Sequence, residues 1–329
     1  AEGCYLYSRH SSPSNLYLSE ALAKMEGTEN ANVTASGMGA ITSVLLQLCK
    51  SGDHIVSSRT IYGGTYAFMK NFLPGLKIDT SFVDITDLAK VEDAINEHTK
   101  VLYCETVSNP LLEIADLKGL SELAKKHNLK LVVDNTFSPL TVSPKFLGAD
   151  VTIHSLTKFI NGSSDAVGGV VCASSAFIND LKNVNNGACM LLGPTMDSLR
   201  AASILKNLRT LHLRMKKHSE NALYLAERWE KDGLNVKYPG LKNHPQHELF
   251  IGMMHPEYGY GGLIALDVKT VEKANELMEM MQHENLGYLA VSLGFYKTPF
   301  SASGTPTSSE IPEDEQTELR SSPGLIRIS

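Results

Sequence analysis

The amino-acid sequence predicts an α/β fold, with a mainly parallel sheet covered by helices and a smaller C-terminal α+β domain. Up to about residue 232, short β-branched runs alternate with amphipathic stretches of helical period. Strands that alternate with helices favour parallel pairing, with helices on both faces of the sheet. After residue 232 the pattern changes to turn-rich pieces between short strand and helix candidates. The 329 residues, 43% of them hydrophobic, are too many for one ordinary domain.

The expected elements follow in chain order. In the larger domain, strands are expected at 54–57, 80–83, 101–104, 130–133, 151–154 and 169–173. Its helices are expected at 38–48, 88–96, 117–127 and, in one long glycine-free stretch, 196–231. The smaller domain should contain a strand at 263–268, a helix at 271–282, and apolar runs at 289–293 and 325–328. Residues 301–322 are rich in Ser, Thr, Pro and Glu and are expected to form a loop over a site or on the surface.

Charge and cysteine content exclude several classes of protein. A net charge of −6 provides no basic field for nucleic acid or anionic lipid, so neither is an expected partner. The apolar stretches are far shorter than the ~20 residues of a membrane helix. The five cysteines are an odd number without a Cys-x-x-Cys pair, which suits a reducing compartment. We therefore expect a cytoplasmic protein, although the chain begins Ala-Glu-Gly and an upstream targeting segment stays open.

Polar residues follow two neighbouring strand candidates. Asp134 comes directly after the run at 130–133, and Ser155, Thr157 and Lys158 follow the run at 151–154. In open α/β sheets the carboxyl ends of strands are where ligands bind. An aspartate there can keep a pyridinium nitrogen protonated, a lysine can form an imine, and two hydroxyl groups can bind a phosphate. The alternative, in which Asp134 caps a helix and Lys158 is a solvated surface residue, is weakened by the combined pattern.

A glycine-containing turn, Ser36-Gly37-Met38-Gly39, precedes the first good helix candidate. Backbone amides at such a helix N-terminus can bind a phosphate. The turn also raises the alternative of a dinucleotide-binding dehydrogenase. That fingerprint requires a third glycine at position 42 and an acidic residue about twenty residues later. Position 42 is Thr and the following strand candidate ends at Ser58-Arg59, which disfavours the dehydrogenase.

Long strings of residues occur in a fixed order over essentially the whole chain. They are Ile61-Tyr-Gly-Gly-Thr, Val133-Asp-Asn-Thr-Phe-Ser-Pro, Gly148-Ala-Asp-Val-Thr-Ile-His-Ser-Leu-Thr-Lys-Phe, Tyr238-Pro-Gly-Leu, His244-Pro-Gln-His-Glu and Gly324-Leu-Ile-Arg-Ile-Ser. These strings closely resemble the cystathionine γ-synthase/methionine γ-lyase family of fold-type I pyridoxal-phosphate (PLP) enzymes. Two more, Ser81-Phe-Val-Asp-Ile-Thr-Asp and Met190-Leu-Leu-Gly-Pro-Thr-Met, are most similar to methionine γ-lyases of the plant type. The resemblance implies a large domain like that of aspartate aminotransferase.

The resemblance also implies how the cofactor, pyridoxal 5'-phosphate, is held. Lys158 would carry it as a Schiff base and Asp134 would contact the pyridine nitrogen. Ser155 and Thr157 would bind the phosphate beside the backbone amides of residues 37–38, which are Gly37 and Met38.

Other matching residues are implied to bind the substrate. Tyr62 would stack on the cofactor ring and exchange a proton with the leaving group. Arg327 would bind the substrate α-carboxylate through its planar guanidinium, with help from Ser292 and Asn109.

The N-terminal segment is implied to serve a neighbouring subunit. Tyr7 and Arg9 match the part of the family pattern that reaches the neighbour's phosphate, so active sites shared within a homotetramer are expected. We divide the chain accordingly into a contacting segment 1–30, a PLP-binding domain 31–232 and a small domain 233–329. The resemblance implies an N-terminal arm before Tyr7 and a strand-helix tail after Ser329, so we expect either a trimmed version of the family's chain or one with an incomplete small domain.

The implied reaction is α,γ-elimination of L-methionine to methanethiol, 2-oxobutanoate and ammonia. A cystathionine γ-lyase or a γ-synthase or homoserine-ester sulfhydrylase shares every cofactor residue and stays open, as does a PLP-binding but inactive subunit. The chain departs from common family residues at Ser163, Lys297 and Gly64, where His, Glu and Cys are frequent. His244 and His247 have a spacing that metal sites use, but Pro245 disfavours a helix there and we expect no metal.

Overall fold

The computed structural model describes Tyr5, residues 7–302 and residues 322–329, and these form two separate sheets. The larger sheet contains β1 (Asn30–Thr34), β2 (His54–Ser58), β3 (Asp79–Val83), β4 (Thr99–Glu105), β5 (Lys130–Asp134), β6 (Val151–Ser155) and β7 (Gly169–Ala173). Its strand order is β1-β7-β6-β5-β4-β2-β3. The neighbours from β3 to β6 are parallel, and β7 is antiparallel to both β6 and β1. The predicted mainly parallel sheet is therefore confirmed.

Helices cover both faces of this sheet because its strands are apolar on both faces. Leu102 and Cys104 of β4 are buried with α1 (Pro13–Glu26) and α5 (Leu117–Lys126). Their neighbours Val101 and Tyr103 are buried on the opposite face with α2 (Gly37–Leu48). Such alternation of fully buried side chains is typical of a sheet sandwiched between helices.

The other helices of this part are short, apart from the last. They are α3 (Gly63–Ala67), α4 (Leu88–Asp93), α6 (Ser175–Leu181), α7 (Ala188–Leu192), α8 (Ser198–Leu208) and α9 (Leu211–Lys231). The prediction of one helix over 196–231 is wrong, because α8 and α9 are separate. At the break, the Thr210 hydroxyl and the Arg214 guanidinium both donate to the Asn207 carbonyl oxygen, at 3.1 and 3.2 Å. These side chains take an acceptor that a continuous helix would use.

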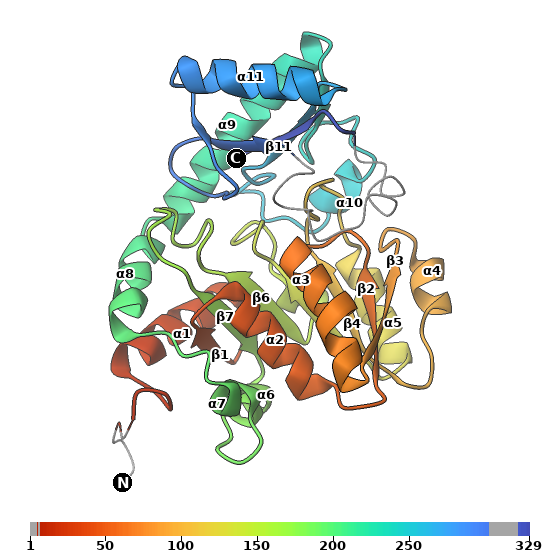
Figure 1. Ribbon diagram of the computed structural model, residues 1–329, viewed down its shortest axis with the longest axis vertical. Coiled ribbons are helices and arrows are strands. Elements are labelled where there is room, and N and C mark those ends of the chain that lie inside the picture. Colours follow the sequence, from red (N-terminus) through yellow and green to blue (C-terminus); the bar gives the residue numbers. More distant parts are fainter. Residues whose placement is uncertain (1–4, 6, 303–321) are drawn as a thin grey trace.

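The second sheet lies at the other end of the molecule, and α9 runs toward it from α8, which lies beside the larger sheet (Figure 1). This second sheet contains β8 (Asn235–Lys237), β9 (Ile264–Asp267), β10 (Tyr288–Leu289), β11 (Pro299–Ala302) and β12 (Leu325–Ile328). Their order in the sheet is β10-β11-β12-β9-β8. Ala222 and Ala226 of α9 and Met278 of α11 (Val271–His283) are buried in its core. A further short helix, α10 (His247–Ile251), follows β8.

Several details of this part differ from expectation. The apolar run 289–293 is a strand only at its first residue, within β10. Residues 301–302, expected in a loop, end strand β11, and residues 303–321 of that expected loop lie outside the described residues. The sequence did not predict five further elements, because their periodic pattern of apolar residues is too weak. They are strands β8 and β11 and helices α1, α6 and α7.

The two sheets meet where Gly294 packs against the turn that follows β6. Gly294 has φ +73°, and a Cβ atom built on it would lie 2.4 Å from the backbone nitrogen of Phe159. Its own N–H donates to the Ser329 hydroxyl at 2.9 Å. Only glycine fits here, because any side chain would meet backbone atoms that cannot move aside.

A pair of glycine substitutions tests this contact. Gly233 also has a positive φ, of +80°, but its Cβ position is open, so Gly233→Ala carries backbone strain alone. We expect Gly233→Ala to lower the free energy of unfolding by about 1–2 kcal/mol. Gly294→Ala should cost about 1–3 kcal/mol more, because it adds the clash. Urea unfolding of both variants measures the difference, and equal losses would contradict the close packing of the two sheets.

Candidate active site

One cavity of about 240 Å³ opens at the carboxyl edge of the parallel strands. Its walls come from the ends of β4, β5 and β6, from the start of α2, and from the second sheet through β12. Residues far apart in sequence therefore share one space. The predicted residues that line it are Gly37, Met38, Tyr62, Asn109, Asp134, Ser155, Thr157, Lys158 and Arg327.

Lys158 enters the cavity from the turn after β6. Its Nζ lies 3.4 Å from the Ser292 hydroxyl, so the predicted Ser292 is brought to the site as well. Burial lowers the pKa of the Lys158 ammonium, and the positive charge of Arg327 lowers it further. The turn itself is held from α9, since the Arg214 guanidinium donates to the carbonyl oxygens of Phe159 and Ile160. A larger share of neutral amine is thus available than on an exposed lysine.

Asp134 and Glu105 end adjacent strands at directly paired positions. Both are buried, and burial raises the pKa of each carboxyl group; the Asp134 charge raises that of Glu105 further. Thr136 stabilises the Asp134 carboxylate, because its backbone N–H and its hydroxyl donate to Oδ1 at 3.0 and 2.6 Å. Neither Glu105 nor Thr136 was predicted as a site residue. Glu105 ends an apolar run in the sequence, and a buried acid at a strand end was the signal that could have found it.

Glu105 joins two loops of the site. Its Oε1 accepts from the backbone N–H of Tyr62 at 2.7 Å, and its Oε2 accepts from the backbone N–H of Asn109 at 3.1 Å. Both predicted residues are therefore placed by one carboxyl group. The Tyr62 side chain lines the cavity with 44% of its surface exposed, as suits a ring that faces a ligand space.

Arg327 of β12 points back toward the larger sheet. Its Nη1 donates to Oδ1 of Asn109 at 2.7 Å and its Nη2 donates to the Ser301 hydroxyl at 3.2 Å. Burial lowers the pKa of Arg327 to about 10, and the nearby Glu105 opposes that shift. The guanidinium thus stays charged at neutral pH and is held rigidly. Such a planar cation is suited to a carboxylate.

The start of α2 forms the other end of the cavity. Ser36 caps the helix, with its hydroxyl accepting from the Gly39 N–H at 3.0 Å. Gly37 lies so close to β6 that a Cβ on it would be 2.9 Å from the Cβ of Ser155. The positive end of the helix therefore opens beside the Ser155 hydroxyl, an arrangement that favours an anion such as phosphate.

Comparison with known proteins agrees with this geometry. Residues 1–329 match the family described as Cys/Met metabolism PLP-dependent enzyme. The chain belongs to this family. It is 49% identical to methionine gamma-lyase of Arabidopsis thaliana over 328 residues, covering 99% of this chain and 74% of that protein. It is 38% identical to cystathionine gamma-lyase of Bacillus subtilis (strain 168) over 329 residues, covering 99% and 84% respectively.

The fold agrees with that of solved members of the family. The crystal structure of cystathionine gamma-lyase from Lactobacillus plantarum complexed with L-serine superposes with a TM-score of 0.92. The two are 28% identical, and the match covers 100% of this chain and 84% of the other. The fold predicted from the resemblance, PLP fold type I, is thereby confirmed.

The residues of the cavity fit the cofactor of this family. Pyridoxal phosphate has an aldehyde, a phosphate and a ring nitrogen, which require an amine, an anion site and a carboxylate. The amine of Lys158, the start of α2 beside Ser155, and the carboxylate of Asp134 line the same cavity. The Thr157 hydroxyl also lines it, although it bonds the backbone of Gly168, donating to the carbonyl at 3.3 Å and accepting from the N–H at 3.2 Å.

Tyr7 and Arg9 lie away from this cavity. Arg9 Nη1 donates to the carbonyl oxygen of Met190 at 2.8 Å, and Tyr7 has 59% of its surface exposed. The chain's own cavity does not include them, so their contribution to a neighbour's site stays a prediction.

His244 and His247, whose spacing occurs in metal sites, both contact the backbone. One ring nitrogen of His244 lies 3.1 Å from the carbonyl oxygen of Leu112, and one of His247 lies 2.8 Å from that of Pro239. Within the described residues, no group of three or more His, Cys, Asp and Glu side chains is placed to hold a metal ion.

In the part of the chain that the structure describes, no helix combines the length and the apolar character needed to cross a bilayer.

The raised pKa of Glu105 predicts a pH-dependent stability of the cofactor-free protein. In the folded state Glu105 keeps its proton at pH values where the unfolded chain releases it. The contribution of this proton to the free energy of unfolding is complete below the usual pKa of glutamate. The contribution is lost as the pH rises through the raised pKa. Glu105→Gln should flatten the decline of the unfolding free energy between pH 5 and pH 8, by at most about 1.4 kcal/mol per pH unit. Urea unfolding measures it, with Glu122→Gln, at an exposed position, as control. Parallel declines in both variants would refute the assignment.

Proposed function

We propose that this chain catalyses the α,γ-elimination of L-methionine, which with one water gives methanethiol, 2-oxobutanoate and ammonia. The observation that carries the proposal is that one cavity contains an amine, an aromatic hydroxyl and a guanidinium, from Lys158, Tyr62 and Arg327. The 49% identity to a methionine gamma-lyase supports the choice of methionine. An inactive PLP-binding subunit is disfavoured, because none of these groups is replaced.

We assign the cofactor to residues of the larger sheet and of α2. Lys158 is the residue that binds it covalently, and Asp134 is the partner of the ring nitrogen. The phosphate is assigned to Ser155, to Thr157 and to the backbone amides of residues 37–38. Pyridoxal phosphate, when bound, supplies an electron sink for the negative charge that develops on the substrate carbon atoms.

The side chains around the substrate supply orientation and proton transfer. Arg327, with Asn109 and Ser292 beside it, binds the α-carboxylate and so directs the Cα–H bond toward Lys158. The Lys158 amine, whose pKa burial lowers, removes the Cα proton and has a stem flexible enough to reach Cβ as well. The Tyr62 hydroxyl protonates the departing sulfur, which leaves as methanethiol.

Cystathionine is the competing thioether, because the 38% identical relative is a cystathionine gamma-lyase. Gly64 is a departure from the common family pattern that lies beside the proton donor. A Cβ at this position would lie 2.6 Å from Cε1 of Tyr62 and 3.3 Å from the sulfur of Met38. Glycine therefore lets the Tyr62 ring lie over residue 64. Lys297, another departure, donates to the Tyr288 hydroxyl at 2.7 Å at an exposed position.

We further propose a cytoplasmic homotetramer whose active sites are shared between subunits. Exposed Tyr7 and Arg9 on the N-terminal segment support the sharing, because their rings and charges have no role in their own cavity. The domain division proposed is a contacting segment 1–30, a PLP-binding domain 31–232 and a small domain 233–329. The position of the second sheet at the far end of α9 supports the last boundary (Figure 1).

The reaction is tested by product analysis with the purified holoenzyme. L-methionine should yield methanethiol and 2-oxobutanoate in equal amounts, and Lys158→Ala should lose both turnover and the visible absorption of lysine-bound cofactor. Tyr62→Phe should lower kcat by roughly 10²–10⁴-fold with unchanged cofactor content, because only the proton donor is removed. Arg327→Ala should chiefly raise KM. Cleavage of cystathionine without release of methanethiol would reassign the substrate, and no 2-oxobutanoate from either would reject the γ-lyase chemistry.

Shared active sites are tested by mixing two inactive variants. Arg9→Ala damages the segment assigned to the neighbour's site, and Lys158→Ala damages the chain's own site. Heterodimers of the two should recover part of the methionine turnover, because one of their two sites contains no substitution. Activity that stays absent in heterodimers verified by mass spectrometry would mean that each chain builds its site alone.

A further inference from the structure

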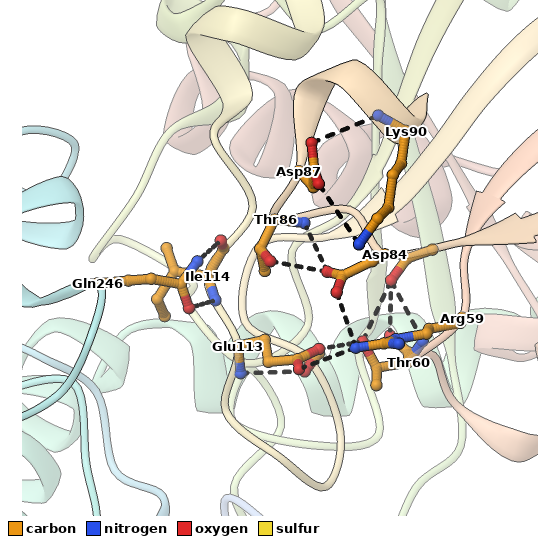
Figure 2. A network of polar contacts seen from close by, with 11 residues as sticks. Arg59, Thr60, Asp84, Thr86, Asp87, Lys90, Glu113, Ile114 and Gln246 are labelled. Atoms are coloured by element: carbon orange, nitrogen blue, oxygen red, sulfur yellow. Dashed lines mark hydrogen bonds and ion pairs between the residues drawn. The ribbon is translucent and has the colours of Figure 1, made fainter. Parts of the chain in front are cut away.

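The segment between β8 and α10 makes contacts that the cofactor chemistry does not explain. His244 Nε2 lies 3.1 Å from the carbonyl oxygen of Leu112. The Gln246 side-chain amide makes two hydrogen bonds to the backbone of Ile114. Its Oε1 accepts from the Ile114 N–H at 2.9 Å, and its Nε2 donates to the Ile114 carbonyl oxygen. Figure 2 shows this pair of bonds. A short segment of the second sheet's part of the chain thus binds a loop of the larger sheet.

The hydrogen bonds also define the protonation of His244. Its Nδ1 accepts from the backbone N–H of Gln246 at 3.2 Å, so the proton of the neutral ring is on Nε2. Nε2 is then the donor to the Leu112 carbonyl oxygen. Burial lowers the pKa of His244, and the neutral ring has the one donor and one acceptor that these contacts need.

The loop that is bound, residues 107–114, contains a residue in an unfavourable backbone conformation. Leu112 is buried and has φ +58°, a region that costs about 1–2 kcal/mol for a residue with a side chain. Such a conformation persists only where the surroundings hold it. Here the loop is closed at its base by a bridge between Val107 and Ile114, Gln246 binds the backbone of Ile114, and His244 binds the carbonyl oxygen of Leu112.

The same loop carries Asn109, whose amide oxygen accepts from Arg327 at 2.7 Å. Further along this loop, the Glu113 carboxylate accepts a hydrogen bond from the Thr60 hydroxyl at 2.7 Å. The same carboxylate lies 3.9 Å from the Arg59 guanidinium (Figure 2). The N–H of Glu113 donates to the Ser108 hydroxyl at 3.1 Å, beside Asn109. A shift at residues 112–113 therefore acts on Ser108, the residue directly before Asn109.

We propose that His244 and Gln246 are positioning residues that hold loop 107–114 so that Asn109 orients Arg327 for the substrate carboxylate. This inference rests on the proposed function, because it assigns Arg327 to that carboxylate. The two residues touch neither the reacting atoms nor the cofactor cavity. Their loss should weaken binding of the carboxylate and leave the cofactor in place.

The test compares two ligands that differ only by a carboxylate. L-norleucine has the length of methionine and no leaving group, and pentylamine is norleucine without its carboxylate. Each is titrated into the holoenzyme, and the change in visible absorption of the bound cofactor gives Kd. Gln246→Met keeps the length of the side chain and removes both hydrogen bonds. It should raise the Kd of norleucine about 5–10-fold and change that of pentylamine less than about twofold.

Three further variants separate the possible outcomes. Asn243→Ala, at an exposed position of the same segment, should change neither Kd. Gln246→Asn, which keeps the amide but is too short for both bonds, replaces Gln246→Met if that variant does not fold. Arg327→Ala is the reference for a lost carboxylate contact and should affect norleucine alone.

The outcomes distinguish this inference from the function on which it rests. If Arg327→Ala weakens norleucine but the Gln246 variants do not, the positioning role is overturned and the proposed function stands. If the Gln246 variants weaken both ligands equally, the residue has only a general structural role and the inference is again overturned. If Arg327→Ala itself leaves norleucine unaffected, the carboxylate assignment fails, and the inference fails with it.

Discussion

The arrangement of this site depends on two buried carboxyl groups at paired positions of adjacent parallel strands. Glu105 and Asp134 end β4 and β5 side by side, where burial raises the pKa of both and the Asp134 charge further opposes the ionisation of Glu105. Neighbouring groups donate hydrogen bonds to both acids. Thr136 donates to Asp134, and the backbone amides of Tyr62 and Asn109 donate to Glu105. The need to satisfy two buried acids thereby determines where the neighbouring loops lie.

The second sheet supplies the remaining wall of the cavity. It contributes the cation Arg327, whereas the larger sheet contributes the acids Glu105 and Asp134. Arg327 is buried on β12 and bonds to Asn109, whose backbone N–H donates to Glu105, so the guanidinium is joined to the larger sheet through this loop. Gly294 allows the second sheet to approach the turn of Lys158 without a clash. Because the junction is tightly packed and hydrogen-bonded, the amine and the guanidinium hold a fixed separation, which orientation-dependent proton transfer requires.

The sequence predicted the central strands, the covering helices α2, α4 and α5, and most residues of the cavity. Strands β5 and β6 are rich in β-branched and apolar residues, Asp134 ends the first and Lys158 lies in the turn after the second, so their position at the sheet edge could be inferred. The break at Thr210 could not, because it arises from side chains that compete for one carbonyl oxygen. Glu105 was missed for a related reason. Its place at the end of an apolar run indicates a buried acid, but its bond to the backbone N–H of Tyr62, 43 residues earlier, is a contact that no local pattern reveals.

The contacts of Gln246 have a consequence for how this family's sequences can change. Gln246 and His244 recognise backbone atoms of residues 112 and 114, and every residue other than proline offers the same N–H and carbonyl groups. Side chains on the recognised loop can therefore be exchanged during evolution, within the limits of packing, without loss of these bonds. The recognising side chains have no such freedom. Selection should thus act unequally on the two partners of one contact, tolerating drift in the loop while retaining the amide and the imidazole that bind it.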